Sequence, residues 1–138
     1  MRLLAATAAA LTLTGCYLLD PDLQPEGTDE VTIGIGETTQ VDLGTWSPGV
    51  GDDWGVPTQI EGGAVDAHVV MNSEVFGVRD RRDEPGTGGS FPYAVELTGL
   101  EPGTSTVRII YCYRTPIAED CDQGPHEIDP LEITVTVR

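Results

Sequence analysis

The sequence has no lysine, and its 7 basic residues are all arginine, against 23 acidic residues. The formal net charge is −16 at pH 7. Proteins that bind nucleic acid or anionic lipid headgroups need a basic face, so this balance argues against both kinds of partner. The ordinary interpretation of the carboxylates is a solvated acidic surface that keeps an exposed protein soluble. A dedicated cation site is the less common alternative.

Catalytic motifs are also missing. Aromatic residues make up only 6% of the chain, which argues against an aromatic ligand pocket. The two histidines, His68 and His126, lie far apart and in no metal-binding spacing, and no GxSxG motif marks a nucleophile. Residues 120–124 (DCDQG) resemble the start of a calcium loop, but the required Gly and Glu are replaced by Pro125 and Leu131. We therefore expect no enzyme activity, no catalytic residue, no metal site and no cofactor.

Beyond residue 20 the sequence has no long apolar run and no sustained 3.6-residue periodicity. Apolar residues alternate with polar or small ones instead, and this period of two is typical of half-buried β-strands. Glycine and proline, at 17 and 10 residues, separate the alternating segments. This pattern predicts an all-β, antiparallel β-sandwich of seven or eight strands. The expected strands lie near residues 31–35, 41–43, 65–69, 75–78, 91–97, 107–113 and 131–137.

The first residues form the one apolar run. Leu3 to Leu13 covers about eleven residues, too few for a membrane-spanning helix of ~20, and fits a secretory signal peptide. It ends in Leu-Thr-Gly-Cys16, which resembles the bacterial lipobox. That resemblance implies cleavage before Cys16 and acylation of its thiol. The alternative is an ordinary signal peptide with a chance cysteine.

The lipobox resemblance implies an exported, lipid-anchored protein of the cell envelope. Residues 1–15 would be the signal peptide, residues 16–29 a tether rich in Pro, Asp and Gly, and residues 30–138 the domain. The residue after the cysteine is Tyr17 rather than Asp, which by resemblance to known sorting patterns favours the outer membrane of a Gram-negative cell. In a Gram-positive cell the same anchor implies the outer face of the plasma membrane.

The number of cysteines fits this location. If Cys16 carries lipid, Cys112 and Cys121 remain, nine residues apart in a protein whose compartment favours disulfides. Their pairing would fix the loop between them. The alternative, a metal site, lacks the CxxC spacing and the histidine pairs that zinc prefers.

The stretch SPGVGDDW, residues 47–54, carries the best indication of function. It resembles the chagasin family of cysteine-protease inhibitors, which are small immunoglobulin-like domains with a loop NPTTG followed by an aromatic residue. Pro48, Gly51 and Trp54 match this pattern. Ser47 stands in place of Asn, and Gly49 and Val50 replace the two Thr residues.

Two further segments extend the resemblance over about residues 30–138. In GTGGSFPYAVEL, Gly86, Gly88 and Gly89 match a G-x-G-G turn before a strand, with Thr87 between them. In EPGTSTVRIIYCYRTP, Tyr111 matches, and Arg114 and Pro116 stand near the family's Arg-Pro pair with Thr115 between them. The aromatic residue expected next is replaced by Ile117.

The resemblance implies an immunoglobulin-like sandwich in which three loops at one end occlude the active-site cleft of a papain-like cysteine protease. The expected contact residues are Ser47, Pro48, Gly49, Val50, Gly51, Gly86, Thr87, Gly88, Gly89, Tyr113, Arg114, Thr115 and Pro116. Asp52 and Asp53 depart from the pattern, because carboxylates beside an apolar cleft cost desolvation unless they are paired. The alternatives are a structural or adhesive immunoglobulin-like envelope lipoprotein with no protease target, and a ligand-binding lipoprotein.

Overall fold

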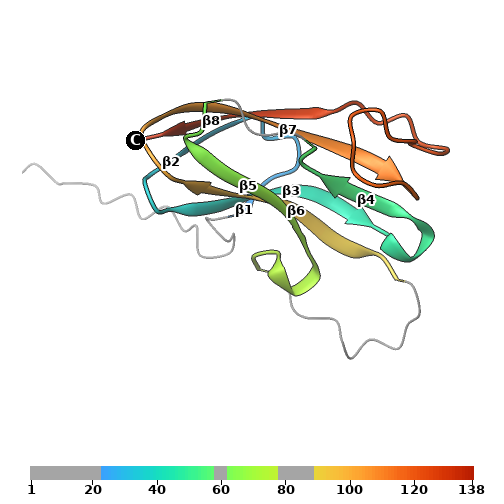
Figure 1. Cartoon of the computed structure of the whole chain (residues 1–138). Coiled ribbons are helices and arrows are strands. Elements are labelled where there is room, and N and C mark those ends of the chain that lie inside the picture. Colours follow the sequence, from blue (N-terminus) through green and yellow to red (C-terminus); the bar gives the residue numbers. More distant parts are fainter. Residues whose placement is uncertain (1–22, 58–61, 78–88) are drawn as a thin grey trace, which may run out of the picture.

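The alternating segments form eight strands in two four-stranded sheets that pack face to face (Figure 1). The computed structural model describes residues 23–57, 62–77 and 89–138. Sheet A has the order β1-β3-β6-β5, and sheet B has the order β2-β8-β7-β4. The strands are β1 (Leu23–Gln24), β2 (Glu30–Ile33), β3 (Thr38–Trp46), β4 (Asp52–Gly55), β5 (Val65–Met71), β6 (Phe91–Gly99), β7 (Gly103–Tyr113) and β8 (Leu131–Val137).

The sequence predicted antiparallel sheets, but both sheets are mixed. Four pairs are antiparallel, namely β3–β6, β5–β6, β4–β7 and β7–β8. β1 pairs with β3, and β2 with β8, in parallel. The cause is the alternation of direction along the chain. Each connection reverses the chain, so strands whose numbers differ by an even number run the same way, whichever sheet brings them together.

The core lies between the sheets and is made of the inward residues of the alternating segments. Its largest fully buried members include Tyr111, Leu43, Leu97, Ile109 and Ile133. The prediction of a β-sandwich is therefore confirmed, and β8 has the one-sided burial expected for the last strand. Ile35 is an exception, since it lies past the end of β2 and is 55% exposed.

The strand predicted near residues 75–78 is wrong for the described part. Asn72–Glu74 form the short 3-10 helix η3, and residues 75–77 are not a strand. Val75 is nonetheless buried, because it packs with Val70 and Ala94 in a second small cluster, with Leu23 against it. Its apolar character reflects this separate packing and not a place in the sheet.

Gln40 holds this segment against sheet A from a fully buried position. Its Nε2 donates to the carbonyl oxygen of Glu74 at 2.8 Å and to Glu96 Oε2 at 2.8 Å. Its Oε1 accepts from the backbone nitrogen of Phe76 at 2.8 Å. One amide side chain thus fixes the beginning of the connection between β5 and β6, which also contains the predicted second loop.

The chain joins sheet A earlier than the sequence indicated. Leu23 and Gln24 form β1 and pair with β3, within the segment interpreted as a tether over residues 16–29. The predicted signal peptide and Cys16 lie outside the described residues. Across residues 23–57, 62–77 and 89–138 there is no helix with the length and apolar character needed to span a bilayer.

Replacing Gln40 with leucine should lower the free energy of unfolding by about 2–4 kcal/mol, because buried backbone groups would lose their partners. Urea denaturation followed by circular dichroism measures this change. Thr32→Ala, on the exposed side of β2, is the control and should change it by less than about 0.5 kcal/mol. An unchanged stability in the Gln40 variant would show that the amide does not anchor the segment.

Candidate functional site

The connection between β3 and β4 is a tight turn formed by Ser47 to Gly51. Pro48–Val50 is the 3-10 helix η2, with proline in its first turn, where a fixed φ suits the turn and no amide donor is lost. Gly51 follows with φ 113°, a conformation that favours glycine. Gly49 and Val50 are exposed, and Val50 keeps 49% of its surface in solvent. The turn therefore presents an apolar tip on a short, ordered segment.

Asp52 points into the protein and not toward a partner. It is 8% exposed. Its Oδ2 accepts from the backbone nitrogen of Ser47 at 3.0 Å, and its Oδ1 accepts from the hydroxyl of Tyr111. Asp52 and Asp53 were expected to oppose contact with an apolar cleft. Asp52 does not, because its carboxylate is paired inside the fold. Asp53 is exposed, with Oδ1 accepting from the backbone nitrogen of Trp54 at 2.9 Å.

Four rings pack beneath the turn and support it. The ring of Trp46 lies 5.4 Å from Trp54, 5.2 Å from Tyr111 and 6.5 Å from His126, measured between centroids. Trp46 Nε1 also donates to the carbonyl oxygen of Leu43 at 2.6 Å. The rings come from β3, β4, β7 and the loop after β7. Trp46 meets Trp54 and His126 edge to face, and such aromatic packing adds to simple burial. The base of the turn is therefore rigid.

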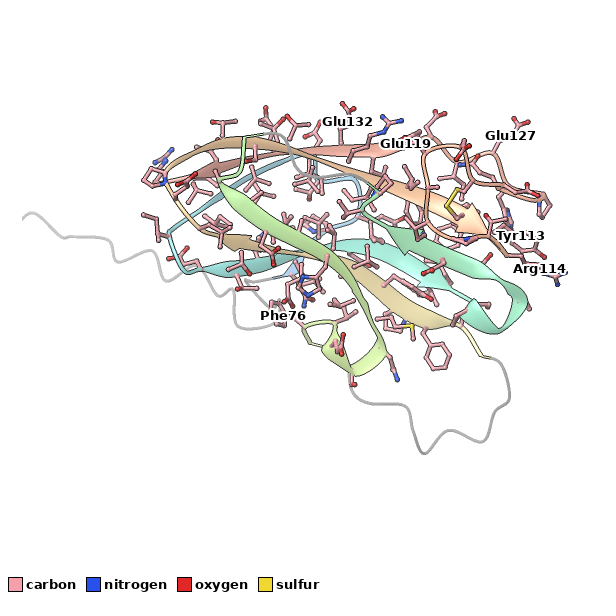
Figure 2. All side chains as sticks on the ribbon, viewed as in Figure 1. Phe76, Tyr113, Arg114, Glu119, Glu127 and Glu132 are labelled. Carbon is pink, nitrogen blue, oxygen red and sulfur yellow. A yellow bond between two sulfur atoms is a disulfide. The ribbon has the colours of Figure 1, made fainter. Side chains whose placement is uncertain are left out.

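The loop after β7 is closed on itself by the predicted disulfide between Cys112 and Cys121 (Figure 2). Their Cα atoms are 5.7 Å apart. The backbone nitrogen of Tyr113 donates to the carbonyl oxygen of Asp122 at 2.7 Å, which extends the closure by one residue. The disulfide and this hydrogen bond both restrain the third loop, as expected from the sequence.

Arg114 joins the third loop to the first. Its backbone nitrogen donates to the carbonyl oxygen of Gly51 at 2.9 Å, and its Nε donates to that of Val50 at 3.0 Å. Its guanidinium carbon lies 5.1 Å from the centre of the Tyr113 ring, and Figure 2 shows the two side chains together at this end. A Cβ atom at Gly51 would overlap Arg114 Cγ, so the close approach of the loops requires glycine there.

The other predicted contact residues have different environments. Ser90, next to the exposed Gly89, places its Oγ 2.9 Å from Ser47 Oγ and so joins the second loop to the first. Gly86, Thr87 and Gly88 lie outside the described residues. Pro116 is exposed and Thr115 is partly buried. The described parts of all three predicted loops thus meet at one end of the sandwich.

Ile117, which replaces the expected aromatic residue, does not project from the loop. It is partly buried, and a Cβ atom at Gly55 would lie 2.7 Å from Ile117 Cγ2. The side chain therefore covers the glycine of β4. It fixes the loop against the strand and does not add a second apolar tip.

Two roles were not predicted from the sequence, namely the internal pairing of Asp52 and the ring contacts of Trp46. Alternation would have revealed the first, because Asp52 and Trp54 are two residues apart in one strand and share a face. Since Trp54 is a core residue, Asp52 must point the same way. The position of Trp46 depends on a shift of the strand register between Asp42 and Gly44 in β3. No local sequence pattern predicts this shift.

The two histidines lie in different surroundings. His68 lies on β5, with Nε2 3.4 Å from Glu96 Oε1 and Nδ1 3.8 Å from Asp66 Oδ2. His126 belongs to the ring cluster. Within the part of the chain that the structure describes, no three His, Cys, Asp or Glu side chains are placed to hold a metal ion.

Alkaline pH should destabilise the domain through two tyrosines near the turn. Burial raises the pKa of Tyr93 to about 12, with smaller contributions from Asp53 and Asp52. Burial and then the hydrogen bond to Asp52 raise the pKa of Tyr111 well above its usual range. An unfolded tyrosine ionises near pH 10, so the stabilisation is complete below about pH 10 and is lost as pH rises to about 12.

Urea denaturation at increasing pH measures this loss. The absence of lysine makes the test clean, because no other abundant side chain titrates between about pH 9 and 12. Tyr93→Phe is the matched variant, and its stability should fall less steeply over this range. A midpoint that stays constant up to about pH 12 would contradict the burial of both phenols.

Comparison with known proteins places the fold. No family model and no curated protein matches the chain. Among solved structures, the solution structure of amebosin is similar with a TM-score of 0.56 and 23% identity, over 86% of this chain and 100% of that one. The crystal structure of the cysteine protease inhibitor EhICP2 from Entamoeba histolytica is similar with a TM-score of 0.53 and 17% identity, over 84% of this chain and 94% of that one.

At these identities the similarity concerns the fold, and the immunoglobulin-like sandwich implied by the resemblance to the chagasin family is confirmed. The chain shares its fold with a solved protein that is a cysteine protease inhibitor.

Proposed function

We propose that this protein inhibits papain-like cysteine proteases by occluding the active-site cleft with residues 47–51, 86–89 and 113–117. The observation that carries the proposal is the direct bonding between these connections. Arg114 bonds to Val50 and Gly51, and Ser90 lies within hydrogen-bonding distance of Ser47. Segments remote in sequence are thereby joined at one end of the sandwich, which supports a wedge-shaped inhibitor.

Rigidity supports this function. A loop that enters a cleft loses affinity in proportion to the freedom that it gives up on binding. Here the first loop is held by its own 3-10 hydrogen bonds, by Asp52 beneath it and by Arg114 beside it. The disulfide restrains the third loop. Little ordering is left to be done when a protease binds.

The chemistry of the tip supports it as well. Val50 is one of four large hydrophobic side chains with high exposure in the described residues, and it stands at the apex of the first loop. Glycine on either side leaves the backbone free of bulk and able to approach another protein closely. The carboxylate that follows, Asp52, is buried and paired, so it adds no desolvation cost to the contact.

The structural comparison adds a precedent. One protein with this fold is a cysteine protease inhibitor, EhICP2. The sequence resemblance to the chagasin loops names the same target class. Both lines are independent of the hydrogen bonds that join the loops.

The test is titration of papain with the chain lacking its first 16 residues, a form that keeps every described strand. The wild-type protein should abolish hydrolysis of a peptide substrate at a stoichiometric amount. Val50→Asp should weaken inhibition by about 100-fold or more, because a charge would enter an apolar cleft without a partner. The Val50 variant should keep the wild-type melting temperature within about 2 °C, because this side chain is exposed.

Ile35→Asp is the matched control, since Ile35 is 55% exposed and lies in the turn before β3, at the opposite end of that strand. It should inhibit as well as the wild type. If the wild-type chain leaves papain active at about 100 μM, the alternative of a structural or adhesive envelope module is favoured. Equal inhibition by the Val50 and Ile35 variants would show that the assigned loop does not enter the cleft.

We further propose that the protein is held at the cell envelope by lipid on Cys16, with the chain up to β1 as the tether. The lipobox resemblance of residues 13–16 supports this, and two or three acyl chains hold a protein at a membrane durably. In a bacterial host, the full chain should incorporate labelled palmitate and partition into detergent. Cys16→Ser should do neither, and labelling that persists in this variant would refute the anchor.

A further inference from the structure

The first loop raises a chemical question. A cysteine protease cuts a peptide bond when its thiolate reaches the carbonyl carbon while the carbonyl oxygen enters an oxyanion hole. An inhibitor that places backbone in the cleft must deny this geometry. If the protein acts as proposed, residues 47–51 enter the cleft, and some feature of the loop must prevent their cleavage.

Local hydrogen bonds occupy the first two carbonyl groups of the turn. The oxygen of Ser47 accepts from the backbone nitrogens of Val50 at 3.1 Å and Asp52 at 3.3 Å. The oxygen of Pro48 accepts from the backbone nitrogen of Gly51 at 3.0 Å. The bonds from Val50 and Gly51 belong to the 3-10 conformation, and the bond from Asp52 closes the turn. This conformation is not the extended form that a protease cleft accepts as substrate.

The carbonyl oxygens of Val50 and Gly51 accept hydrogen bonds from Arg114, which lies outside the turn. Its Nε holds the Val50 oxygen at 3.0 Å, and its backbone nitrogen holds the Gly51 oxygen at 2.9 Å. The carbonyl oxygens of Ser47, Pro48, Val50 and Gly51 are thus bonded within the protein, and the last two are bonded to Arg114.

We infer that Arg114 is a positioning residue that makes the first loop an inhibitor and not a substrate. By holding the Val50 oxygen toward the third loop, it keeps that oxygen out of the oxyanion hole and keeps the Val50–Gly51 bond from being attacked. Arg114 was expected to contact the protease. In this role it acts through the first loop.

The residue is suited to this task. A guanidinium stays charged at every relevant pH, and a hydrogen bond from a charged donor is stronger than one between neutral groups. The side chain is further placed by the Tyr113 ring, 5.1 Å from its centre, and its backbone has φ 57°, a left-handed conformation set by the folded loop. Because Gly51 has no Cβ, the Arg114 stem lies directly against the turn.

Without the side chain of Arg114, the following cleavage becomes accessible. The protease thiolate adds to the Val50 carbonyl carbon, and the bond to the Gly51 nitrogen breaks as that nitrogen takes a proton from the protease histidine. Water then hydrolyses the thioester, which leaves a carboxylate on Val50 and restores the thiol. The inhibitor is consumed and the protease regains activity.

The experiment incubates the chain lacking residues 1–16 with a tenth of an equivalent of papain and follows both activity and intact mass. The wild type should stay intact and inhibit stably. Arg114→Ala should inhibit at first and then lose inhibition, with fragments cut within residues 47–51 formed at least about tenfold faster than from the wild type. Arg114→Lys keeps the charge but not the Nε donor, and it should be cut as well.

Arg108→Ala is the control, because it removes an arginine of β7, the strand that precedes Arg114, and this arginine pairs with Glu119 and Glu132. It should remain intact. If the Arg114 variants inhibit stably and stay whole, or are cut only outside residues 47–51, the inference is wrong while the proposed function stands. If the wild type itself neither inhibits nor protects its loop, the proposed function fails and the inference fails with it.

Discussion

The buried carboxylate of Asp52 is the constraint on which the rest of the site depends. It sits where the chain passes from sheet A to sheet B, and it binds Ser47 on one side and Tyr111 of β7 on the other. A charged group in a nearly closed environment is tolerated only when its hydrogen bonds are satisfied. Those partners fix both the beginning of the turn and its distance from β7. The exposed tip, Gly49 and Val50, is placed as a consequence.

The same end of the molecule gathers parts that are far apart in the chain. β4 pairs with β7 so that Asp52 lies opposite Tyr113, and β3 pairs with β6 so that Trp46 lies opposite Phe91. These two registers bring the first loop beside the third and the second, respectively. The loop contacts through Arg114 and Ser90 then follow from short distances that the sheets have already set. Strand register is therefore the origin of the proposed wedge.

Much of the fold could be predicted from the sequence because a period of two is a local property. Residues 131–137 alternate clearly, and the structure places them in sheet B as β8. Prediction of strands from a period of two fails at residues 75–78. Val75 is apolar because it packs under a bend held by Gln40, and burial of that kind has no period. The disulfide was predictable because only two cysteines remain once Cys16 is assigned to lipid.

Some features of the candidate site could likewise be predicted from the sequence, and others could not. The sequence by itself determined the composition of the loops: glycine and proline at residues 47–51, the acidic character of the chain and the cysteine pair. Only the tertiary structure decided which groups pair with the inward-facing Asp52, that Ile117 covers β4 and that Arg114 holds Val50. These three outcomes depend on contacts between residues up to 64 positions apart. Such contacts are set by strand register and the close packing of two sheets, and a side chain's identity and near neighbours do not specify them.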